Sequence, residues 1–530
     1  MADKYVLAHD MGTSGNKAVL VSVYGEIIDM HKETYPLYHP SPGYAEQDPL
    51  EWWGAVCKAT RSVLEKTAIN PGQIVGITFS SQVQSLIPVN KSGDPLCHAL
   101  TWLDVRSAEI LHEQLWTHPR VMGYNIFHLF NFLRITGGSP GHTGKDQIGK
   151  ILWLKKYQPE IFQNAYKYLD AKDFVIFKLT GNMVTSVDVA YIWWMLDSRK
   201  NRNQWHPKLC GLAGITPEQL AEIRESADIV GHLTEDAARE TGLNPGTPVI
   251  NGAGDLSSAA LGSGAIQEGQ LHIRIGTSGG VAGHFSKRKI DLAHYAGCIG
   301  STYPSKYYLG IAHQETAGLC LEWLKNKVLY HEEQLTKESK VEDIYQLLDQ
   351  LVAESRPGAA GLIFTPWMFG ERCPLDNDYI RAGFFNINLN HNRVHLLRAV
   401  YEGVAFNTRW AMETLEKLYQ PVTELNIIGG GAKSDIWCQI VADITNRKIN
   451  QVENPQQASA KGVALLASMS LGFVADYFEI PKYIKIKKQF LPNPDLRRLY
   501  DTFFVEFKNL YRQNKKWYAR MNAFTANTTQ

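Results

Sequence analysis

A four-residue sequence, Gly-Thr-Ser-Gly, occurs twice in this chain, each time between two apolar segments. The first copy spans residues 12–15, between YVLAHDM and NKAVLVSV, and the second spans residues 276–279, between LHIRI and GVAGHF. Apolar runs bounded by glycine and serine are typical of strands, so both places are expected to form a strand, a turn and a second strand. Four residues alone repeat easily by chance in a chain with 43 glycines. The shared setting instead indicates two related halves, each with a turn of the same kind that faces phosphate.

The first turn carries more polar side chains than a tight hairpin requires, because two residues such as Asn-Gly are sufficient for that purpose. Successive backbone N–H groups in a glycine-rich turn form a nest for an anion, and the Thr13 and Ser14 hydroxyls add donors. Asp10 ends the first strand, where a carboxylate suits Mg²⁺, and Lys17 can reach a phosphate as a point charge. This hairpin is therefore expected to hold phosphate and a metal ion. The alternative is a hairpin that is tight for structural reasons alone.

The balance of charges argues against nucleic acid or a membrane surface as a partner. The 530 residues include 54 basic and 53 acidic ones, which gives a net charge of +1. No apolar run approaches the roughly 20 residues that span a bilayer, and the start, MADKYVLAHD, shows no secretory signal. The 7 cysteines are scattered and form no CxxC pair, so free thiols in a cytoplasmic protein are expected.

Helix-like and strand-like segments alternate along most of the chain, which predicts an α/β fold. One helix is expected after Asp48 as N-cap, with Pro49 at the first helical position and Glu51 as a capping-box partner. Residues 72–82, GQIVGITFSSQ, follow as a buried strand. Residues 477–530 are basic and aromatic, and their helical apolar spacing predicts one or two amphipathic helices that pack on the body.

Two common nucleotide-binding motifs are absent from the sequence. There is no GxxxxGK[ST] P-loop, and residues 252–257, GAGDLS, lack the third glycine of the GxGxxG fingerprint. Asp255 in this segment would repel a dinucleotide pyrophosphate, which disfavours an NAD-dependent dehydrogenase. The same carboxylate suits a base that takes a proton from a hydroxyl. The alternatives for Asp255 are a buried structural carboxylate and a helix cap.

A third glycine cluster lies in residues 424–444, ELNIIGGGAKSDIWCQIVADI, where it follows a strand and opens a helix. A helix N-terminus suits an anion, and glycines allow a base or ribose to approach closely. The alternative is a plain strand-to-helix turn. Two phosphate turns, a central aspartate and this glycine turn together describe an ATP-dependent phosphotransferase.

These motifs resemble those of the FGGY carbohydrate kinases and, within that family, the xylulokinases. They are DMGTSGNK, GYAEQDPLEWW, TWLDVRS, AKDFVIFKLTG, GAGD, IGTSG, GERCP, AVYEGVAFNTRW and GGGAKSDIW. The resemblance implies an α/β fold of two actin-like (ribonuclease H-like) ATPase domains with a catalytic cleft between them. It implies an N-terminal domain over 1–262 with the sugar side, a C-terminal domain over 263–476 with the nucleotide side, and a helical extension over 477–530.

The resemblance also implies roles for individual residues. Asp255 matches the catalytic base, and Asp10 matches the aspartate that holds Mg²⁺ and phosphate. The positions that match ATP-binding residues are Gly12, Thr13, Ser14, Lys17, Gly276, Thr277, Ser278, Gly318, Gly430, Gly431, Ala432 and Ser434. The positions that match sugar-binding residues are Gln82, Val83, Gln84, Trp102, Asp104, Arg106, Asp255 and Leu256. For Trp102 the alternative is core packing, and for Asp104 with Arg106 it is a local ion pair.

Two departures from the xylulokinase motifs bear on which sugar is the substrate. Where xylulokinases read Gln-Met-His-Gly, residues 82–85 read Gln-Val-Gln-Ser, and where asparagine follows their catalytic aspartate, this chain has Leu256. The expected function is transfer of the ATP γ-phosphate to a ketose, polyol or sugar acid other than D-xylulose, by a protein that forms a homodimer.

Two alternatives come from other functional classes. One is an actin-like ATPase that acts as an assembly or chaperone switch without a sugar substrate. It accounts for both phosphate turns but not for Trp102, Asp104 and Arg106 beside a central base. The other is a sugar-binding regulator with a dead kinase site, which the intact Asp10 and Lys17 argue against.

Overall fold

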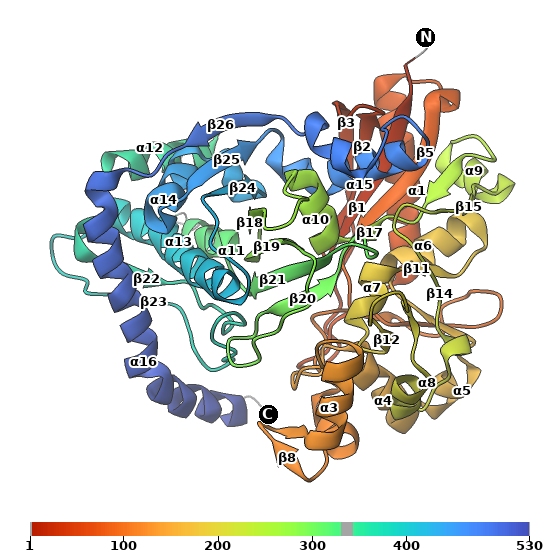
Figure 1. Ribbon diagram of the computed structural model, residues 1–530, viewed down its shortest axis with the longest axis horizontal. Coiled ribbons are helices and arrows are strands. Elements are labelled where there is room, and N and C mark those ends of the chain that lie inside the picture. The colour runs from red at the N-terminus through yellow and green to blue at the C-terminus, as the bar shows by residue number, and fades with distance from the viewer. Residues whose placement is uncertain (1–2, 330–342, 529–530) are drawn as a thin grey trace, which may run out of the picture.

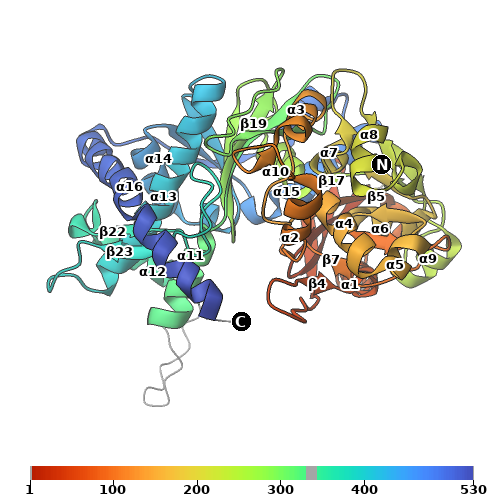
Figure 2. The same cartoon turned by 90° about the horizontal axis from the view of Figure 1, so that it is seen from below.

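Two seven-stranded sheets, one in each half of the chain, form the framework of the protein (Figure 1). The computed structural model describes residues 3–329 and 343–528. The N-terminal half, drawn red to yellow, and the C-terminal half, drawn green to blue, lie side by side in both views (Figures 1 and 2). This arrangement confirms the two-part α/β architecture expected from the sequence.

The N-terminal sheet is built around the first predicted hairpin. Its order is β15-β16-β5-β1-β2-β3, and β17 also pairs with β5. Because β1 is antiparallel to β2 and parallel to β5, it is central and buried, which explains its nearly continuous apolar run. The strands are β1 (Tyr5–Gly12), β2 (Gly15–Ser22), β3 (Ile27–Thr34), β5 (Ile74–Ser81), β15 (Ile229–His232), β16 (Pro248–Ile250) and β17 (Ala253–Gly254).

Helices cover both faces of this sheet, and one of them comes from the far end of the chain. Helices α1 (Pro49–Thr67) and α6 (Ala171–Thr180) pack on the face that carries Leu7. Helix α15 (Ala458–Ser470) packs on the opposite face, which carries Val6. Successive side chains of a strand point to opposite faces, so β1 contributes to both cores.

Helix α1 begins as predicted, with one difference. The Asp48 carboxylate accepts a 2.8 Å hydrogen bond from the backbone N–H of Leu50, and Pro49 is the first helical residue. The predicted capping box is wrong, because the Glu51 carboxylate accepts a 2.8 Å hydrogen bond from the Tyr38 hydroxyl instead. Glu51 thus ties the helix to the segment before it.

The C-terminal sheet has the order β20-β21-β19-β18-β24-β25-β26. Strands β18 and β19 form the second predicted hairpin, and β18 is parallel to β24 as β1 is parallel to β5. This repetition confirms the two related halves. The strands are β18 (Leu271–Ile275), β19 (Gly279–Phe285), β20 (Gly297–Gly300), β21 (Tyr308–Gln314), β24 (Glu424–Ile428), β25 (Lys448–Val452) and β26 (Ile486–Phe490). The helices that pack with this sheet include α11 (Gly318–Leu324), α12 (Ile344–Glu354), α13 (Arg393–Leu418) and α14 (Asp435–Thr445).

Shorter elements surround both sheets. In the N-terminal half they include α2 (Ala108–Ile110), α3 (Ile126–Ile135), α4 (Gln147–Tyr157), α5 (Pro159–Asn164), α7 (Val187–Ile192), α8 (Pro207–Ala213) and α9 (Glu235–Thr241). Two-stranded pairs join β4 (Glu46–Gln47) to β7 (Ala99–Leu100), β6 (Ile87–Val89) to β10 (Lys167–Leu169), β8 (Arg120–Val121) to β9 (Tyr124–Asn125), β11 (Val184–Ser186) to β14 (Glu222–Arg224), β12 (Leu196–Asp197) to β13 (Gln204–Trp205), and β22 (Ile363–Thr365) to β23 (Gly383–Phe385).

The segment after residue 476 contains a strand as well as the predicted helix. Helix α16 (Arg497–Thr528) runs along the outer edge of the C-terminal half in Figure 1, and its Phe504 and Phe507 are buried against α13. The sequence analysis missed β26, which pairs with β25 at the sheet edge. Its lysine-rich sequence, IKKQF, hides the strand signal, because lysines are typical of protected edge strands.

Two helices cross between the halves at a pair of glycines. Helix α10 (Asp255–Ser263) lies beside α15 in both views (Figures 1 and 2). A Cβ atom on Gly262 would lie 1.7 Å from the Ala458 carbonyl oxygen, and one on Gly462 would lie 2.5 Å from the Gly262 nitrogen. The two backbones are therefore in direct contact, which only glycine permits.

The cysteines agree with the sequence analysis, since all seven are free thiols and all except Cys97 are buried. Within the described parts of the chain, no helix has the length and apolar character needed to cross a membrane.

The helix crossing predicts that Gly262→Ala will lower the free energy of unfolding by about 3 kcal/mol, because the new methyl group meets a backbone oxygen that cannot turn away. Gly54→Ala is the matched control, since Gly54 is also helical and has open space around its Cβ position. The free energy of unfolding of this control is expected to rise by about 0.5–1 kcal/mol. Urea unfolding of both variants measures the difference, and equal midpoints would contradict the packing described.

Candidate active site

The first hairpin brings together Asp10, Lys17 and Ser80 at the end of β1. Asp10 faces Lys17 across the hairpin, and the Lys17 ammonium donates to the Asp10 carboxylate at 3.2 Å. The Ser80 hydroxyl donates to its other oxygen at 3.1 Å. The Asp10 side chain is 18% exposed, so the carboxylate remains accessible. A single accessible carboxylate fits Mg²⁺, which proteins hold through one or two carboxylates together with substrate phosphates.

The turn itself is held from outside by three side chains. The Gln47 amide donates to the Thr13 carbonyl at 2.8 Å, and the Trp102 indole donates to the Thr13 hydroxyl at 2.9 Å. The Tyr35 hydroxyl donates to the Gly12 carbonyl. Ser14 is exposed at the tip. Trp102 is therefore not core packing alone, because it joins the predicted sugar side to the first turn.

The sheet register places Asp255 at the same edge as Asp10. Asp10 pairs with Ser80 on β5, and Ser80 pairs with Ala253 on β17. Asp255 follows as the first residue of α10, with its carboxylate 31% exposed. The helix N-cap is Gly254, so the cap alternative for the Asp255 side chain does not apply. The Asp188 carboxylate accepts from the Gly254 N–H at 2.8 Å and fixes the turn that presents Asp255.

The second turn is held by the start of α11. The Gly318 N–H donates to the Gly276 carbonyl at 2.7 Å, and the Ala317 N–H donates to the Thr277 carbonyl at 3.0 Å. A Cβ atom on Gly318 would lie 2.6 Å from the Gly276 oxygen. The structure thus brings Gly318 into contact with Gly276 and Thr277 of the second turn.

The third glycine cluster lies against the strand that leads into the second turn. A Cβ atom on Gly431 would lie 2.4 Å from an Ile275 side-chain carbon, so the glycine backbone packs directly on β18. Gly430 is partly exposed beside it. Ala432 is fully buried, and the Ser434 hydroxyl caps α14 and donates to Asp349 at 2.8 Å. Ala432 and Ser434 therefore stabilise the third glycine cluster, through burial and through the cap of α14.

On the predicted sugar side, Gln84 is held by two buried aspartates. Its amide donates to Asp146 at 3.0 Å and its backbone N–H donates to Asp170 at 3.1 Å, while its φ of 66° lies in the left-handed region. Val83 and Leu256 pack at the edge of an apolar cluster that includes residues of α7. Gln82 is buried, and its amide donates to Gln47 at 2.9 Å.

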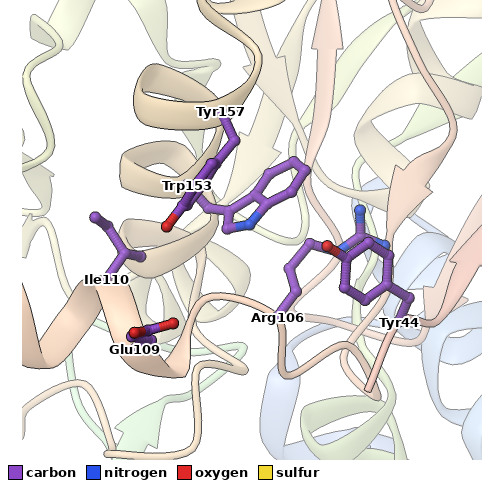
Figure 3. A pocket seen from close by; sticks show the side chains of 6 residues that line it. All are labelled: Tyr44, Arg106, Glu109, Ile110, Trp153 and Tyr157. Atoms are coloured by element: carbon purple, nitrogen blue, oxygen red, sulfur yellow. The ribbon is translucent and has the colours of Figure 1, made fainter. Parts of the chain in front are cut away.

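Asp104 and Arg106 form the local ion pair that was the alternative for them. The Arg106 guanidinium contacts the fully buried Asp104 carboxylate at 2.7 Å and Glu46 at 2.6 Å. It lies 3.7 Å from the ring centre of Tyr44 and 4.9 Å from that of Trp153. Tyr44, Arg106 and Trp153 also line a cavity of about 210 Å³, together with Glu109, Ile110 and Tyr157 (Figure 3). Asp255 is not among the lining residues.

The sequence analysis missed Arg274, which joins the predicted base to the second turn. Arg274 lies on β18, and its Nη1 donates to Asp255 Oδ2 at 2.9 Å while its Nη2 donates to the Ser278 hydroxyl at 3.2 Å. The signal was an arginine in the strand segment LHIRI, which directly precedes the turn.

Three buried aspartates that position the site were also missed: Asp146, Asp170 and Asp188. Burial raises the pKa of all three, and that of Asp170 reaches about 7. Each accepts several N–H or O–H donors, such as the Gly141 N–H on Asp146 and the Trp193 indole on Asp170. The signal for them was an acidic residue within an apolar stretch.

An ion-pair group connects the two halves. The Glu315 carboxylate lies 2.7 Å from Arg372 of the C-terminal half and 3.7 Å from Lys145 of the N-terminal half. Although burial raises the pKa of the Glu315 carboxyl, the charges of Arg372 and Lys145 outweigh burial and lower it from 4.5 to about 2. Glu315 therefore stays charged at neutral pH and keeps the bridge intact.

This pKa predicts a stability difference that disappears in acid. A carboxyl whose pKa is lower in the folded protein stabilises it above the unfolded pKa, and the effect is lost as the pH falls through the folded pKa. We expect Glu315→Gln to lower the free energy of unfolding by about 3 kcal/mol at neutral pH, from the shift between 4.5 and about 2. The difference should shrink between about pH 4.5 and 2. Thermal unfolding of both proteins against pH tests this, and a constant difference across that range would contradict it.

The sequence matches one protein family over both halves. The N-terminal domain of the FGGY family of carbohydrate kinases matches residues 5–262, and its C-terminal domain matches residues 271–471. A xylulose kinase of Bacillus subtilis is 29% identical over 99% of this chain and 100% of its own length. A gluconokinase of the same organism is 28% identical over 98% of this chain and 97% of its own. The crystal structure of gluconate kinase from Lactobacillus acidophilus has a TM-score of 0.85 and 27% identity, and covers 98% of this chain and 100% of its own.

The fold and these similarities define a phosphotransferase that uses ATP and acts on a carbohydrate. The chain belongs to the FGGY family of carbohydrate kinases. Nothing in these similarities supports the alternative of an ATPase switch without a sugar substrate.

Proposed function

We propose that this kinase transfers the γ-phosphoryl group of Mg²⁺·ATP to a hydroxyl of a ketose, polyol or sugar acid, with Asp255 as the base. The observation that carries the proposal is a continuous series of contacts between the two turns. It leads from Asp10 through Ser80 to the strand before Asp255, and from Asp255 through Arg274 to Ser278. This series of contacts supports a single site that contains the proposed proton acceptor and both proposed phosphate-binding turns.

In the proposed reaction, the acceptor oxygen forms a bond to the γ-phosphorus while the bond from phosphorus to the bridging oxygen breaks. ADP leaves with that electron pair, and the hydroxyl proton passes to the Asp255 carboxylate. Such transition states are loose, so positioning and electrostatics contribute more than base strength. The backbone N–H groups of both turns and the Lys17 ammonium are expected to bind the phosphate oxygens.

Asp10 is the residue that we expect to hold Mg²⁺, because its carboxylate is accessible and lies beside the first turn. When bound, Mg²⁺ supplies a Lewis acid that withdraws charge from the phosphoryl oxygens. Lys17 pairs with Asp10 at 3.2 Å, so both side chains are expected to lie beside a phosphate bound at the first turn.

The acceptor is proposed to differ from D-xylulose because of Gln84 and Leu256. One N–H of the Gln84 amide donates to Asp146, which leaves the second N–H and the amide oxygen for a sugar hydroxyl. Leu256 has no polar atom on its side chain and packs against apolar neighbours, so it offers no partner to a sugar. The alternative is that water or a neighbouring side chain supplies the hydrogen bonds at these two positions, so that D-xylulose remains the substrate.

The homodimer, the cytoplasmic location and the domain boundaries after residues 262 and 476 stay predictions from the sequence. Light scattering of the purified protein measures the oligomeric state.

Asp255→Asn is expected to lower the rate of sugar phosphorylation by about 10²- to 10⁴-fold, because the amide cannot accept the proton. The affinity for ADP is expected to stay within a few-fold of that of the unmodified protein. Lys17→Ala is the contrasting variant, expected to weaken Mg²⁺·ATP use without changing the order of preferred sugars. A coupled ADP-release assay and titration calorimetry measure both. Near-normal turnover by Asp255→Asn would show that another group is the base.

In a panel of ketoses, polyols and sugar acids, kcat/KM for D-xylulose is expected to fall below the best acceptor by about 5- to 150-fold, which corresponds to one unpaired polar group. Gln84→His and Leu256→Asn, singly and together, should raise the value for D-xylulose. D-xylulose as the clear best substrate of the unmodified protein would refute the assignment.

A further inference from the structure

Arg274 occupies the space between the predicted base and the second phosphate turn. Its two Nη nitrogens divide between these groups, with Nη1 on Asp255 at 2.9 Å and Nη2 on the Ser278 hydroxyl at 3.2 Å. The side chain is 21% exposed, so a ligand in the site can reach it. A guanidinium has five N–H donors, and these two contacts leave three of them for a ligand.

The position of Arg274 on β18 explains why it faces the site. Leu271, Ile273 and Ile275 point into the core of the C-terminal half, so Arg274 points to the opposite face. Its neighbour across the strand pair is Gly280, which has no side chain to cover the guanidinium. The strand therefore presents an arginine, two residues before the second turn, on the side where Asp255 lies.

We propose that Arg274 is a further catalytic residue, which binds the phosphoryl group during transfer. This inference rests on the proposed function of Asp255 and the two turns. An arginine beside a transferring phosphoryl group stabilises the charge on its equatorial oxygens, and its planar fork suits phosphate.

The ion pair with Asp255 couples this contact to proton transfer. As the acceptor oxygen bonds to phosphorus and the bond to ADP breaks, the hydroxyl proton moves to Asp255, whose charge is neutralised. The attraction between Asp255 and Arg274 then weakens, and the positive charge is left for the phosphoryl oxygens. Arg274 keeps all its protons throughout, so it changes partner without changing charge.

Two other roles for Arg274 make different predictions. If it bound a carboxylate of the acceptor, its loss would raise KM for the acceptor and leave kcat nearly unchanged. If it only positioned Asp255, its loss would have no further effect once Asp255 is replaced. If it contacts the phosphoryl group, its loss lowers kcat and weakens the binding of a transition-state analogue, whether Asp255 is present or replaced.

The experiment compares Arg274→Met and Arg274→Lys with Arg224→Met, which removes an exposed arginine paired with Glu222 on β14. We expect Arg274→Met to lower kcat by about 10²- to 10³-fold, with KM values for ATP and acceptor within a few-fold. Arg274→Lys should lose less, and the control should match the unmodified protein. Normal ADP binding shows that each variant is folded.

The decisive readout is the binding of ADP with Mg²⁺ and aluminium fluoride, relative to ADP alone. We expect Arg274→Met to weaken the analogue by at least about 10²-fold, also in the Asp255→Asn background. Unchanged analogue binding, or a loss that vanishes in that background, overturns the proposal. If the unmodified protein phosphorylates no acceptor, the proposed function fails, while the analogue comparison still decides the role of Arg274.

Discussion

The backbone contact between Gly262 of α10 and Gly462 of α15 is the constraint on which the rest of the structure depends. Helix α15 packs on the first hairpin through residues such as Val463, and α10 carries Asp255 at its N-terminus. Close approach at the glycines therefore fixes Asp255 relative to both sheets. A side chain at either position would push the helices apart, because the neighbouring atoms belong to backbone.

Hydrogen bonds around this helix crossing hold the predicted site residues in place. The Asp188 carboxylate accepts a hydrogen bond from the N–H of Gly254, the residue before Asp255, and Trp102 ties the predicted sugar side to Thr13 of the first turn. Arg274 completes the connection to the second turn. The turn before Asp255 and the first turn are each held by a hydrogen bond to a residue far away in sequence. This is the kind of positioning that phosphoryl transfer requires.

Local signals in the sequence were sufficient for both hairpins, the glycine turns and the start of α1 at Asp48, because glycine, hydroxyl and capping residues act over a few positions. Pairings between distant segments were not predictable in this way. Asp146 meets Gln84 from 62 positions away, and Arg274 meets Asp255 from 19. In the sequence alone, Asp146 and Arg274 each indicate only a charged side chain and not its partner. The same limit applies to Glu51, for which a tertiary contact replaced the capping box.

A crystal structure with ADP, Mg²⁺, aluminium fluoride and an acceptor that supports turnover tests the central claim, that the two turns and Asp255 form a single site. The account predicts that the aluminium fluoride contacts backbone N–H groups of both residues 12–15 and residues 276–279. It also predicts that the acceptor hydroxyl lies within hydrogen-bonding distance of the Asp255 carboxylate, about 2.6–3.2 Å. A nucleotide complex that contacts one turn only, or an acceptor oxygen that is held by a base other than Asp255, would contradict it.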